Sequence, residues 1–301
     1  MAQLVTSFRL QASGAAFSQV RPEPLPPDLR LLAGEEDALL LAGHMSGSEF
    51  QSFRDFHNPG LSNADRKDLN RRHDAARDAR SGLDPVATEN AWLGVLEDPR
   101  LQAVEGTAAF ASSFGKMEFE FGWVVPHLVV PSQAYVKINA TQEPEKSADL
   151  FQVAFPQPAQ PKFEVLDGEG GVYYLVSSSP HMNAGPPIIS SAGGLLTVSV
   201  GVHLNFILIA YYGETFFARN GTHRLEWATR MHLDRVPALV VRARSADEAG
   251  VVLGVDGFSM KKLVTKRPPL IGDFRTSAAM TMPVRRSMYG FTLRTRGLRR
   301  A

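Results

Sequence analysis

The stretch FFARNGTHRLEWATRMHLDRVPALVV, residues 216–241, decides how the centre of this chain is expected to fold. Its first apolar residues run into Asn220 and Gly221, a pair that commonly ends a strand. Apolar side chains then recur every three or four positions, which is the spacing of a helix with one buried face. A second apolar run follows after a proline. The pattern therefore predicts a strand, a helix over residues 221–233 and a second strand over 237–243.

The junction between the first strand and the helix has the chemistry of an anion site. The first turn of a helix exposes N–H groups and carries partial positive charge. Gly221 has no Cβ to keep a bulky anion away, and Thr222 can cap the helix or bind a phosphate oxygen. Arg224 offers a planar fork suited to phosphate, and His223 can donate one hydrogen bond. Residues Asn220 to Arg224, called here the Asn220–Arg224 corner, are thus a predicted phosphate site.

A structural interpretation of the same residues stays open. Asn-Gly-Thr is an ordinary turn sequence, His223 is compatible with a core histidine, and Arg224 with a surface partner of Glu226 or Glu214. The two glutamates are also the candidates for a catalytic role, because phosphoryl transfer needs a carboxylate near the phosphates as a base or metal ligand. Glutamates in such positions are more often surface charges.

The stretch resembles the central motif of the ParB/sulfiredoxin superfamily, in which a strand leads into Asp/Asn-Gly-x-His/Arg-Arg, a helix and a Val-Pro strand. The matching elements here are residues 220–224, 225–233 and 236–240. Upstream, LVVPSQAYVK, residues 128–137, is similar to the superfamily's first motif. The resemblance covers about residues 120–243 and implies an α+β fold with a mixed sheet and helices.

The resemblance also implies a function. The corner would hold a nucleoside triphosphate with Mg²⁺, and Ser132 and Gln133 would line the opposite wall. Members of the superfamily include nucleotide-gated DNA clamps, nucleases, a free-serine kinase and sensor domains of defence systems. Sulfiredoxin activity is excluded, because the position of its cysteine is Thr222 and the chain has no cysteine. No helix-turn-helix motif is apparent after residue 243, so a centromere clamp is not expected.

Composition and pattern divide the chain into three predicted parts. The first is an additional mixed α/β region of unknown role over residues 1–115, where protein partners are most expected. The second is a ParB-like domain over residues 116–265, with a Pro/Gly-rich insertion at 155–194 that is either a binding loop or a passive excursion. The third is a basic C-terminal tail over residues 266–301.

Within the first part, residues 35–45 are predicted to form a short helix or buried segment. Residues 62–82 are polar nearly all round, with alternating acids and bases, and predict a solvated surface helix or, as the sharper hypothesis, a helix that faces nucleic acid. Residues 86–96 have helical spacing. In the second part, residues 116–138 and 195–212 are predicted to be strands.

The C-terminal tail is strongly basic although the whole chain has a net charge of only +1. Its arginines are the candidate nucleic-acid contacts, to DNA or RNA, and the alternative is a solubilising or disordered end. The six residues are Arg285, Arg286, Arg294, Arg296, Arg299 and Arg300.

Several classes of protein are unexpected. The composition is that of a globular protein, with 44% hydrophobic and 21% charged residues. No apolar run has transmembrane length and the first residues lack a signal core, so we expect a cytoplasmic protein without a membrane partner. The eight histidines show no pair at helical metal-ligand spacing, and no protein-held metal is predicted.

Three functions are compatible with these features. The first is a nucleotide-binding, nucleic-acid-associated protein, either an NTPase or a nuclease. The second is a non-catalytic interaction module of a multi-protein system, such as defence or phage assembly, that keeps the fold. The third is a small-molecule kinase on the same fold.

Overall fold

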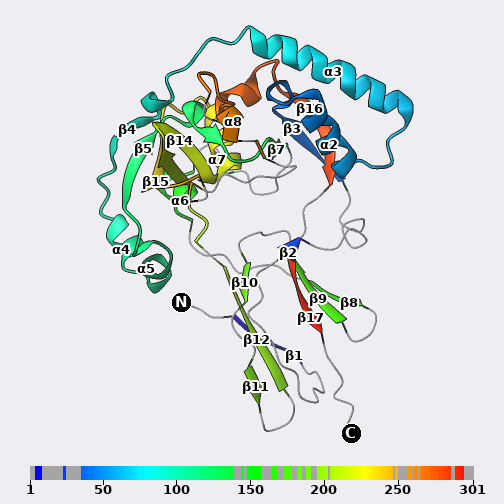
Figure 1. Cartoon of the computed structure of the whole chain (residues 1–301). Coiled ribbons are helices and arrows are strands. Elements are labelled where there is room, and N and C mark those ends of the chain that lie inside the picture. The colour runs from blue at the N-terminus through cyan, green and yellow to red at the C-terminus, as the bar shows by residue number, and fades with distance from the viewer. Residues whose placement is uncertain are drawn as a thin grey trace. The chain divides into compact units, whose positions relative to one another are not determined.

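The structure is a computed structural model, and the residues it describes are 4–8, 23–24, 35–138, 144, 148–156, 164–168, 172–177, 182–184, 188–190, 195–202, 204–246, 248–249, 257–258, 260–263, 265–285 and 289–294. They form two compact units (Figure 1). The large unit comprises residues 35–156 and 205–284, and the small unit comprises 1–34, 157–204 and 285–301. The fold class is α+β, as predicted.

The large unit holds most of the helices. Its strands are β3 (Glu35–Leu40), β4 (Trp92–Val95), β5 (Phe119–Val124), β6 (Val130–Pro131), β7 (Tyr135–Lys137), β13 (Leu208–Tyr212), β14 (Thr215–Asn220), β15 (Val236–Arg242) and β16 (Met280–Arg285). Its α-helices are α2 (Gly47–His57), α3 (Asn63–Ser81), α4 (Leu101–Glu105), α5 (Ala108–Phe114), α6 (Leu150–Ala154), α7 (Thr222–Arg230) and α8 (Met260–Leu263). The 3-10 helices are η2 (Ala42–His44), η3 (Thr88–Ala91), η4 (Pro126–Leu128) and η5 (Ile271–Arg275).

A six-stranded mixed sheet forms the core of the large unit, in the order β4-β5-β15-β13-β14-β6. β15 runs parallel to β13 and antiparallel to β5, whereas β14 runs antiparallel to β13 and parallel to β6. The predicted strand, helix and second strand are confirmed as β14, α7 and β15. The tight turn that joins β13 to β14 contains Gly213 with φ 56°, a left-handed conformation that glycine adopts without strain.

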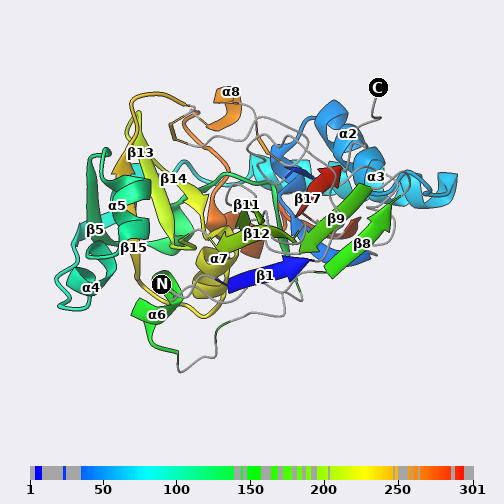
Figure 2. The ribbon, with the colours of Figure 1, turned by 90° about the horizontal axis from the view of Figure 1, so that it is seen from below.

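The sheet is buried on both faces at its centre. The first six residues of β15 are all buried, a pattern typical of a strand covered on both sides. Phenylalanines from α5, β5, the end of α6 and the segment before β13 pack together in pairs such as Phe110 with Phe121 and Phe155 with Phe206. Figure 2 shows α5 beside β5. These rings supply much of the apolar surface that stabilises the large unit.

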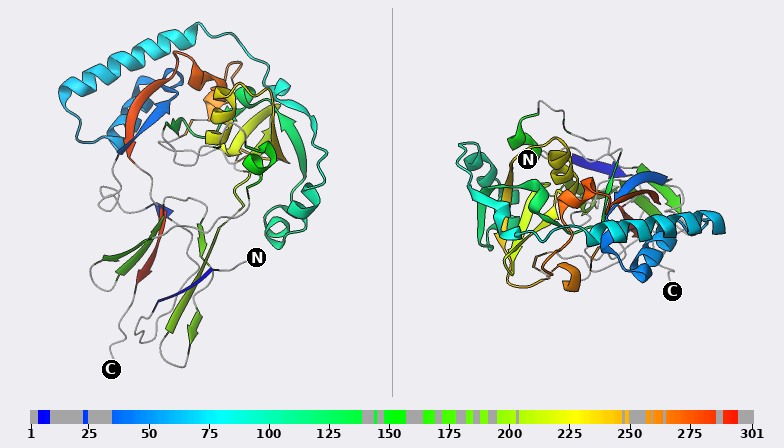
Figure 3. Two further views of the ribbon diagram at one scale, coloured as in Figure 1. Left: turned by 180° about the vertical axis from the view of Figure 1, so that it is seen from behind. Right: turned by 90° about the horizontal axis from the view of Figure 1, so that it is seen from above.

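A three-stranded sheet in the order β16-β3-β7 forms a second layer of the large unit. α2 begins at Ser46, whose side chain and backbone exchange hydrogen bonds with Glu49 in a capping box. α3 is the predicted surface helix and lies at the outside of the large unit (Figure 3). Only Leu69, His73 and Ala76 are buried along it, which is a narrow stripe at helical spacing.

The small unit is built from segments far apart in the sequence. β1 (Leu4–Phe8), β10 (Met182–Ala184) and β11 (Ile188–Ser190) each pair antiparallel with β12 (Leu195–Val202). A second sheet has the order β2-β17-β9-β8, with β2 (Glu23–Pro24), β8 (Glu164–Gly168), β9 (Val172–Ser177) and β17 (Tyr289–Arg294).

The compact units differ from the predicted domains. The boundary at residue 115 falls inside the large unit, because β4 pairs with β5 and β3 pairs with β7. The predicted insertion at 155–194 extends to residue 204, because β12 pairs with β1 instead of joining the sheet of β13. The tail prediction for 266–301 also differs, because β16 joins the sheet of β3 and β17 pairs with β9.

One local prediction in the first part of the chain was wrong. Residues 92–95 form the strand β4 rather than a helix, because pairing with β5 overrides the local helical spacing. Of the two alternatives for residues 35–45, the buried segment holds for residues 41–45, which are all buried, while residues 35–40 form the partly buried strand β3. Gly94 adopts φ 128° at a bulge in β4, a conformation that breaks any helix at this position. Across the described helices, none combines the length and apolarity needed to cross a membrane.

Candidate functional site

The Asn220–Arg224 corner lies where β14 ends and α7 begins. Gly221 adopts φ 91° and ψ 15°, a left-handed conformation that turns the chain from the strand into the helix. A Cβ at this position would lie 3.1 Å from Cα and 3.2 Å from Cγ1 of Ile207. Glycine is therefore required twice, by the backbone conformation and by the close approach of Ile207.

Asn220 holds this turn in place through its amide group. Its Nδ2 donates to Oδ1 of Asn205 at 3.1 Å and to the carbonyl oxygen of Phe206 at 2.9 Å. Its Oδ1 accepts from the N–H of Gly221 at 2.9 Å. The amide of Asn220 is thus used within the protein.

Arg224 also contacts protein groups rather than open space. Its Nη1 donates to the carbonyl oxygen of Val153 at 2.8 Å, and its Nη2 donates to Oδ1 of Asn205 at 2.9 Å. Burial lowers the pKa of Arg224 to about 10, so the guanidinium stays charged at neutral pH. The fork that we predicted for phosphate instead ties α7 to α6 and to the segment before β13.

His223 is held at both ring nitrogens. The backbone N–H of Lys137 donates to Nε2 at 3.0 Å, and Nδ1 lies 3.3 Å from Nε2 of Gln133. Burial, with smaller effects of the charges on Lys137 and Arg224, lowers the pKa of His223 to about 4. A neutral ring that accepts at Nε2 carries its hydrogen on Nδ1, so the Gln133 amide accepts from it only when the amide is flipped and its oxygen takes the place assigned to Nε2.

The donors left at the corner are in the first turn of α7. The first hydrogen bond of the helix runs from the N–H of Leu225 to the carbonyl oxygen of Gly221. The N–H groups of Thr222, His223 and Arg224 make no hydrogen bond with another residue that the structure describes. The same holds for the hydroxyl of Thr222, whose residue is only 5% exposed. Three backbone donors and one hydroxyl are thus gathered at one helix end.

Ser132 and Gln133, predicted to line the opposite wall of the phosphate site, make different contacts. Gln133 meets His223, so the segment between β6 and β7 does lie against the corner as predicted. Ser132 is half-buried beside it and makes no hydrogen bond within the described part of the chain.

The two candidate catalytic glutamates are separated. Glu226 is buried on α7, one turn after Thr222, and its Oε1 lies 3.8 Å from Nε of Arg230 and 3.8 Å from Nη1 of Arg275. Glu214 lies in the turn at the opposite end of β14. A strand advances about 3.3 Å per residue, which places Glu214 about 20 Å from Asn220. Glu214 is therefore too far from the corner to act on a ligand there.

The arginines of the predicted tail are only partly described. Arg285 ends β16 and is half-buried, and Arg294 ends β17. Arg286, Arg296, Arg299 and Arg300 lie outside the described residues. In the described part of the chain, His, Asp and Glu side chains form no group of three that could hold a metal ion.

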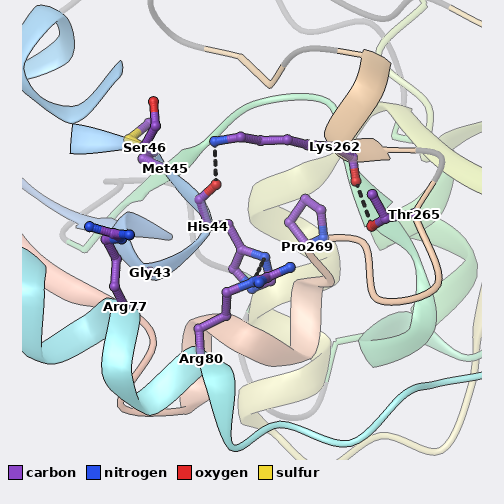
Figure 4. Close-up of a pocket in the computed structure, with 9 residues that line it drawn as sticks. All are labelled: Gly43, His44, Met45, Ser46, Arg77, Arg80, Lys262, Thr265 and Pro269. Carbon is purple, nitrogen blue, oxygen red and sulfur yellow. Dashed lines mark hydrogen bonds between the residues drawn. The ribbon is translucent and has the colours of Figure 1, made fainter. Parts of the chain in front are cut away.

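A basic cleft of about 230 Å³ opens elsewhere in the large unit (Figure 4). It lies between the start of α2, the C-terminal half of α3 and the segment from α8 to Pro269. Arg77 and Arg80 extend into it from α3, and Lys262 extends into it from α8 (Figure 4). None of the described residues that line the cleft is acidic.

A buried network forms the back of the basic cleft. Nε2 of His44 lies 2.9 Å from Oδ2 of Asp273, and Asp273 is also paired with Arg267. Nε of Arg80 donates to Nδ1 of His44 at 3.3 Å, and Nζ of Lys262 donates to the carbonyl oxygen of His44 at 2.6 Å. Burial lowers the pKa of His44, and Asp273 offsets only part of that effect. His44 thus lies between the cations of the cleft and the buried carboxylate of Asp273, and its ring is neutral.

The basic cleft is absent from the predicted sites. Its sequence signal is the run KKLVTKR, residues 261–267, which contains four cations and no acid. The partners of this run, His44 and the end of α3, are about 180 to 220 residues away in the sequence, as the hydrogen bonds of Arg80 and Lys262 show. Only the fold brings them together.

No protein-family model, no curated protein and no solved structure matches this chain.

Proposed function

We propose that this chain is a nucleotide-binding, nucleic-acid-associated protein with a ParB-like fold, and that the Asn220–Arg224 corner holds the phosphates of the nucleotide. Two features support the fold assignment. The strand, left-handed glycine, helix and strand of the resemblance are present in β14, Gly221, α7 and β15. The two resembling segments also meet, through the contact of Gln133 with His223.

The observation that carries the proposal is the set of donors in the first turn of α7 for which no described residue is the acceptor. Backbone N–H groups at a helix N-terminus are favourable partners for phosphate because they donate hydrogen bonds and lie at the positive end of the helix dipole. The hydroxyl of Thr222 adds one side-chain donor to the N–H groups of residues 222–224. Asn220, His223 and Arg224 position this turn through their internal hydrogen bonds, and we assign them a positioning role.

The donor set fits a phosphate group, and Mg²⁺ would come with the nucleotide. When bound, Mg²⁺ would offset the negative charge of the phosphates. Glu226 is the described carboxylate on the face of Thr222, since residues four apart on a helix are neighbours. Its two arginine neighbours, Arg230 and Arg275, hold it in place at one turn from the corner.

The test is nucleotide binding by the full chain and by two variants of Thr222. Thr222→Val keeps the shape of the side chain and removes the hydroxyl, whereas Thr222→Ser keeps the hydroxyl. Calorimetric titration with ATP, CTP, GTP and UTP in Mg²⁺ is expected to show binding of at least one of them. The Val variant should bind it about two- to tenfold more weakly, the effect of one hydrogen bond, and the Ser variant should bind like the wild type. Equal affinity of all three proteins would contradict the assignment of the hydroxyl.

A non-catalytic interaction module is the second candidate function. It is favoured by the complete internal use of the side chains of Asn220, His223 and Arg224, which a scaffold also requires. Absence of binding for all four nucleotides would favour this candidate over nucleotide binding.

A further inference from the structure

The basic cleft carries positive charge that only partly pairs with acidic side chains of the described residues. Lys262 is paired with Glu49, and Arg267 behind the cleft is paired with Asp273. The hydrogen-bond partners of Arg80 are both neutral, namely Nδ1 of His44 and the carbonyl oxygen of Arg267. Arg77 is exposed and makes no hydrogen bond or ion pair with any described residue. Two guanidinium groups in one concave site thus have no ion pair with an acidic side chain among the described residues.

The cleft is built on backbone contacts that allow little movement. A Cβ at Gly43 would lie 2.4 Å from the carbonyl oxygen of Ala76 and 2.9 Å from that of Ala278. η2 therefore packs directly on the backbone of α3, which places Arg77 and Arg80 beside His44. Arg80 is further fixed by two hydrogen bonds of 3.3 Å each. A site with fixed donors loses little side-chain entropy when a ligand binds.

Size and lining narrow the class of ligand. The volume of about 230 Å³ is below the range of roughly 300–1,000 Å³ for pockets that enclose a whole small molecule. The residues described along the cleft include no Phe, Tyr or Trp on which a base would stack. Two guanidinium groups beside a lysine suit a phosphate group, with its two or more acceptor oxygens. The cleft therefore fits a phosphate and its adjoining sugar better than a complete nucleotide.

We propose that the basic cleft is a nucleic-acid contact that binds one phosphate group of a polynucleotide strand through Arg77 and Arg80. Arg80 is the fixed donor and Arg77 the adaptable one. The exposed Lys261 and Lys266 on the same segment add to the positive potential that attracts the strand. The recognition is of backbone rather than base, so the contact is independent of sequence. This inference rests on the proposed association with nucleic acid and names the surface that makes the contact, and no residue of the cleft belongs to the Asn220–Arg224 corner.

The experiment compares two charge reversals on α3. Arg77→Glu changes the cleft, and the matched control Arg71→Glu changes an exposed arginine of the same helix that does not line it. Both variants change the net charge by the same amount, so a general electrostatic effect would weaken DNA binding equally in the two. Binding of the full chain to a fluorescent single-stranded DNA of about 12 nucleotides, a length within the usual site sizes, is followed by anisotropy over a salt series. Thermal unfolding of each variant verifies its fold.

The expected result is a difference between the two variants. Arg77→Glu should weaken binding about ten- to hundredfold, as for loss of a charge-assisted hydrogen bond. It should also reduce the slope of log affinity against log salt by about 0.7, the value for one phosphate contact on a single strand. Arg71→Glu should stay within about threefold of the wild type, an effect below 1 kcal/mol. Equal loss in the two variants, or no binding by the wild type, would overturn the proposal.

A second arm distinguishes the source of the phosphate. The same oligonucleotide is used with a 5′-phosphate and with a 5′-hydroxyl. Tighter binding of the phosphorylated strand, lost in Arg77→Glu, identifies a terminal phosphate, and equal binding identifies an internal phosphodiester. Nucleotide binding at the corner is measured on the same variants: it should persist in Arg77→Glu, so failure of the cleft and failure of the corner give different results.

Discussion

The Asn220–Arg224 corner and the basic cleft use the same residue types in opposite ways. At the corner, Arg224 donates to the carbonyl oxygen of Val153 and to Asn205, and the donors left over belong mainly to the backbone. In the cleft, the backbone packs closely at Gly43. Arg80 also uses Nε and Nη2 within the protein but leaves Nη1 without a described acceptor, and Arg77 makes no hydrogen bond with a described residue. An arginine in a suggestive motif is therefore not by itself a ligand contact, because its hydrogen-bond partners decide its role.

The largest expected effect is on stability. Arg224→Ala should lower the free energy of unfolding by about 3 kcal/mol, because it removes two hydrogen bonds from a charged donor and leaves two acceptors without partners. Arg77→Ala should change it by less than about 0.5 kcal/mol, since an exposed side chain without partners is lost. Urea denaturation of both variants gives the two values. If the two variants were equally stable, the structural role of Arg224 would not differ from that of Arg77, contrary to the account.

Replacing glycines tests whether the backbone of the Asn220–Arg224 corner is as tightly fixed as its side chains. Gly221→Ala should cost about 2 kcal/mol, because φ is 91° and the new Cβ would crowd Ile207. Gly60→Ala is the control, since a Cβ there meets nothing within 4 Å. Thermal unfolding should show a clear fall in Tm for the first variant only. Equal Tm values would mean that the turn into α7 relaxes without cost.

The smallest effect concerns pH. The pKa of His223 is about 4 in the folded protein and about 6.5 in an unfolded chain, so the unfolded state binds the proton first as pH falls. Its contribution to stability is present above pH 6.5 and is lost between pH 6.5 and 4. After allowance for partial exposure, we expect about 1 to 2 kcal/mol from this residue.

The variant His223→Gln isolates that contribution. Glutamine can still accept from the N–H of Lys137 but does not titrate. Urea denaturation at pH 7 and pH 4.5 should show a smaller loss of stability for the variant than for the wild type. Some loss should remain, because burial also lowers the pKa of His44, His73 and His127. The same loss of stability in both proteins would mean that folding does not lower the pKa of His223.

Local elements of the fold could be predicted from the sequence, and non-local ones could not. β14, α7 and β15 follow from apolar periodicity and from the Asn-Gly pair between them. The helix α3 follows from its alternating acids and bases, which pair at the spacing of a surface helix. By contrast, the helical spacing at residues 92–95 was overridden because this segment pairs with β5. β12 pairs with β1, which lies almost two hundred positions earlier in the sequence. Strand pairing over such distances leaves no local signal.

The candidate site shows the same limit. The Asn220–Arg224 corner is contiguous in sequence, and its turn geometry was predictable from Gly221. Which donors stay unused was not predictable, because Asn205 and Val153 come from other segments. Glu214 looked close in sequence, yet the length of β14 places it at the far end of the strand. The basic cleft combines three separate segments and had only the run at 261–267 as a signal.

The most direct test of the account combines the two sites in one set of titrations. The nucleotide that binds the wild type and the single-stranded oligonucleotide are each titrated into Thr222→Val and Arg77→Glu. The account predicts that Thr222→Val weakens binding of the nucleotide but not of the oligonucleotide, and that Arg77→Glu does the reverse. If both variants weaken the same ligand, or if neither ligand responds to either variant, then the separation of the corner from the cleft is wrong.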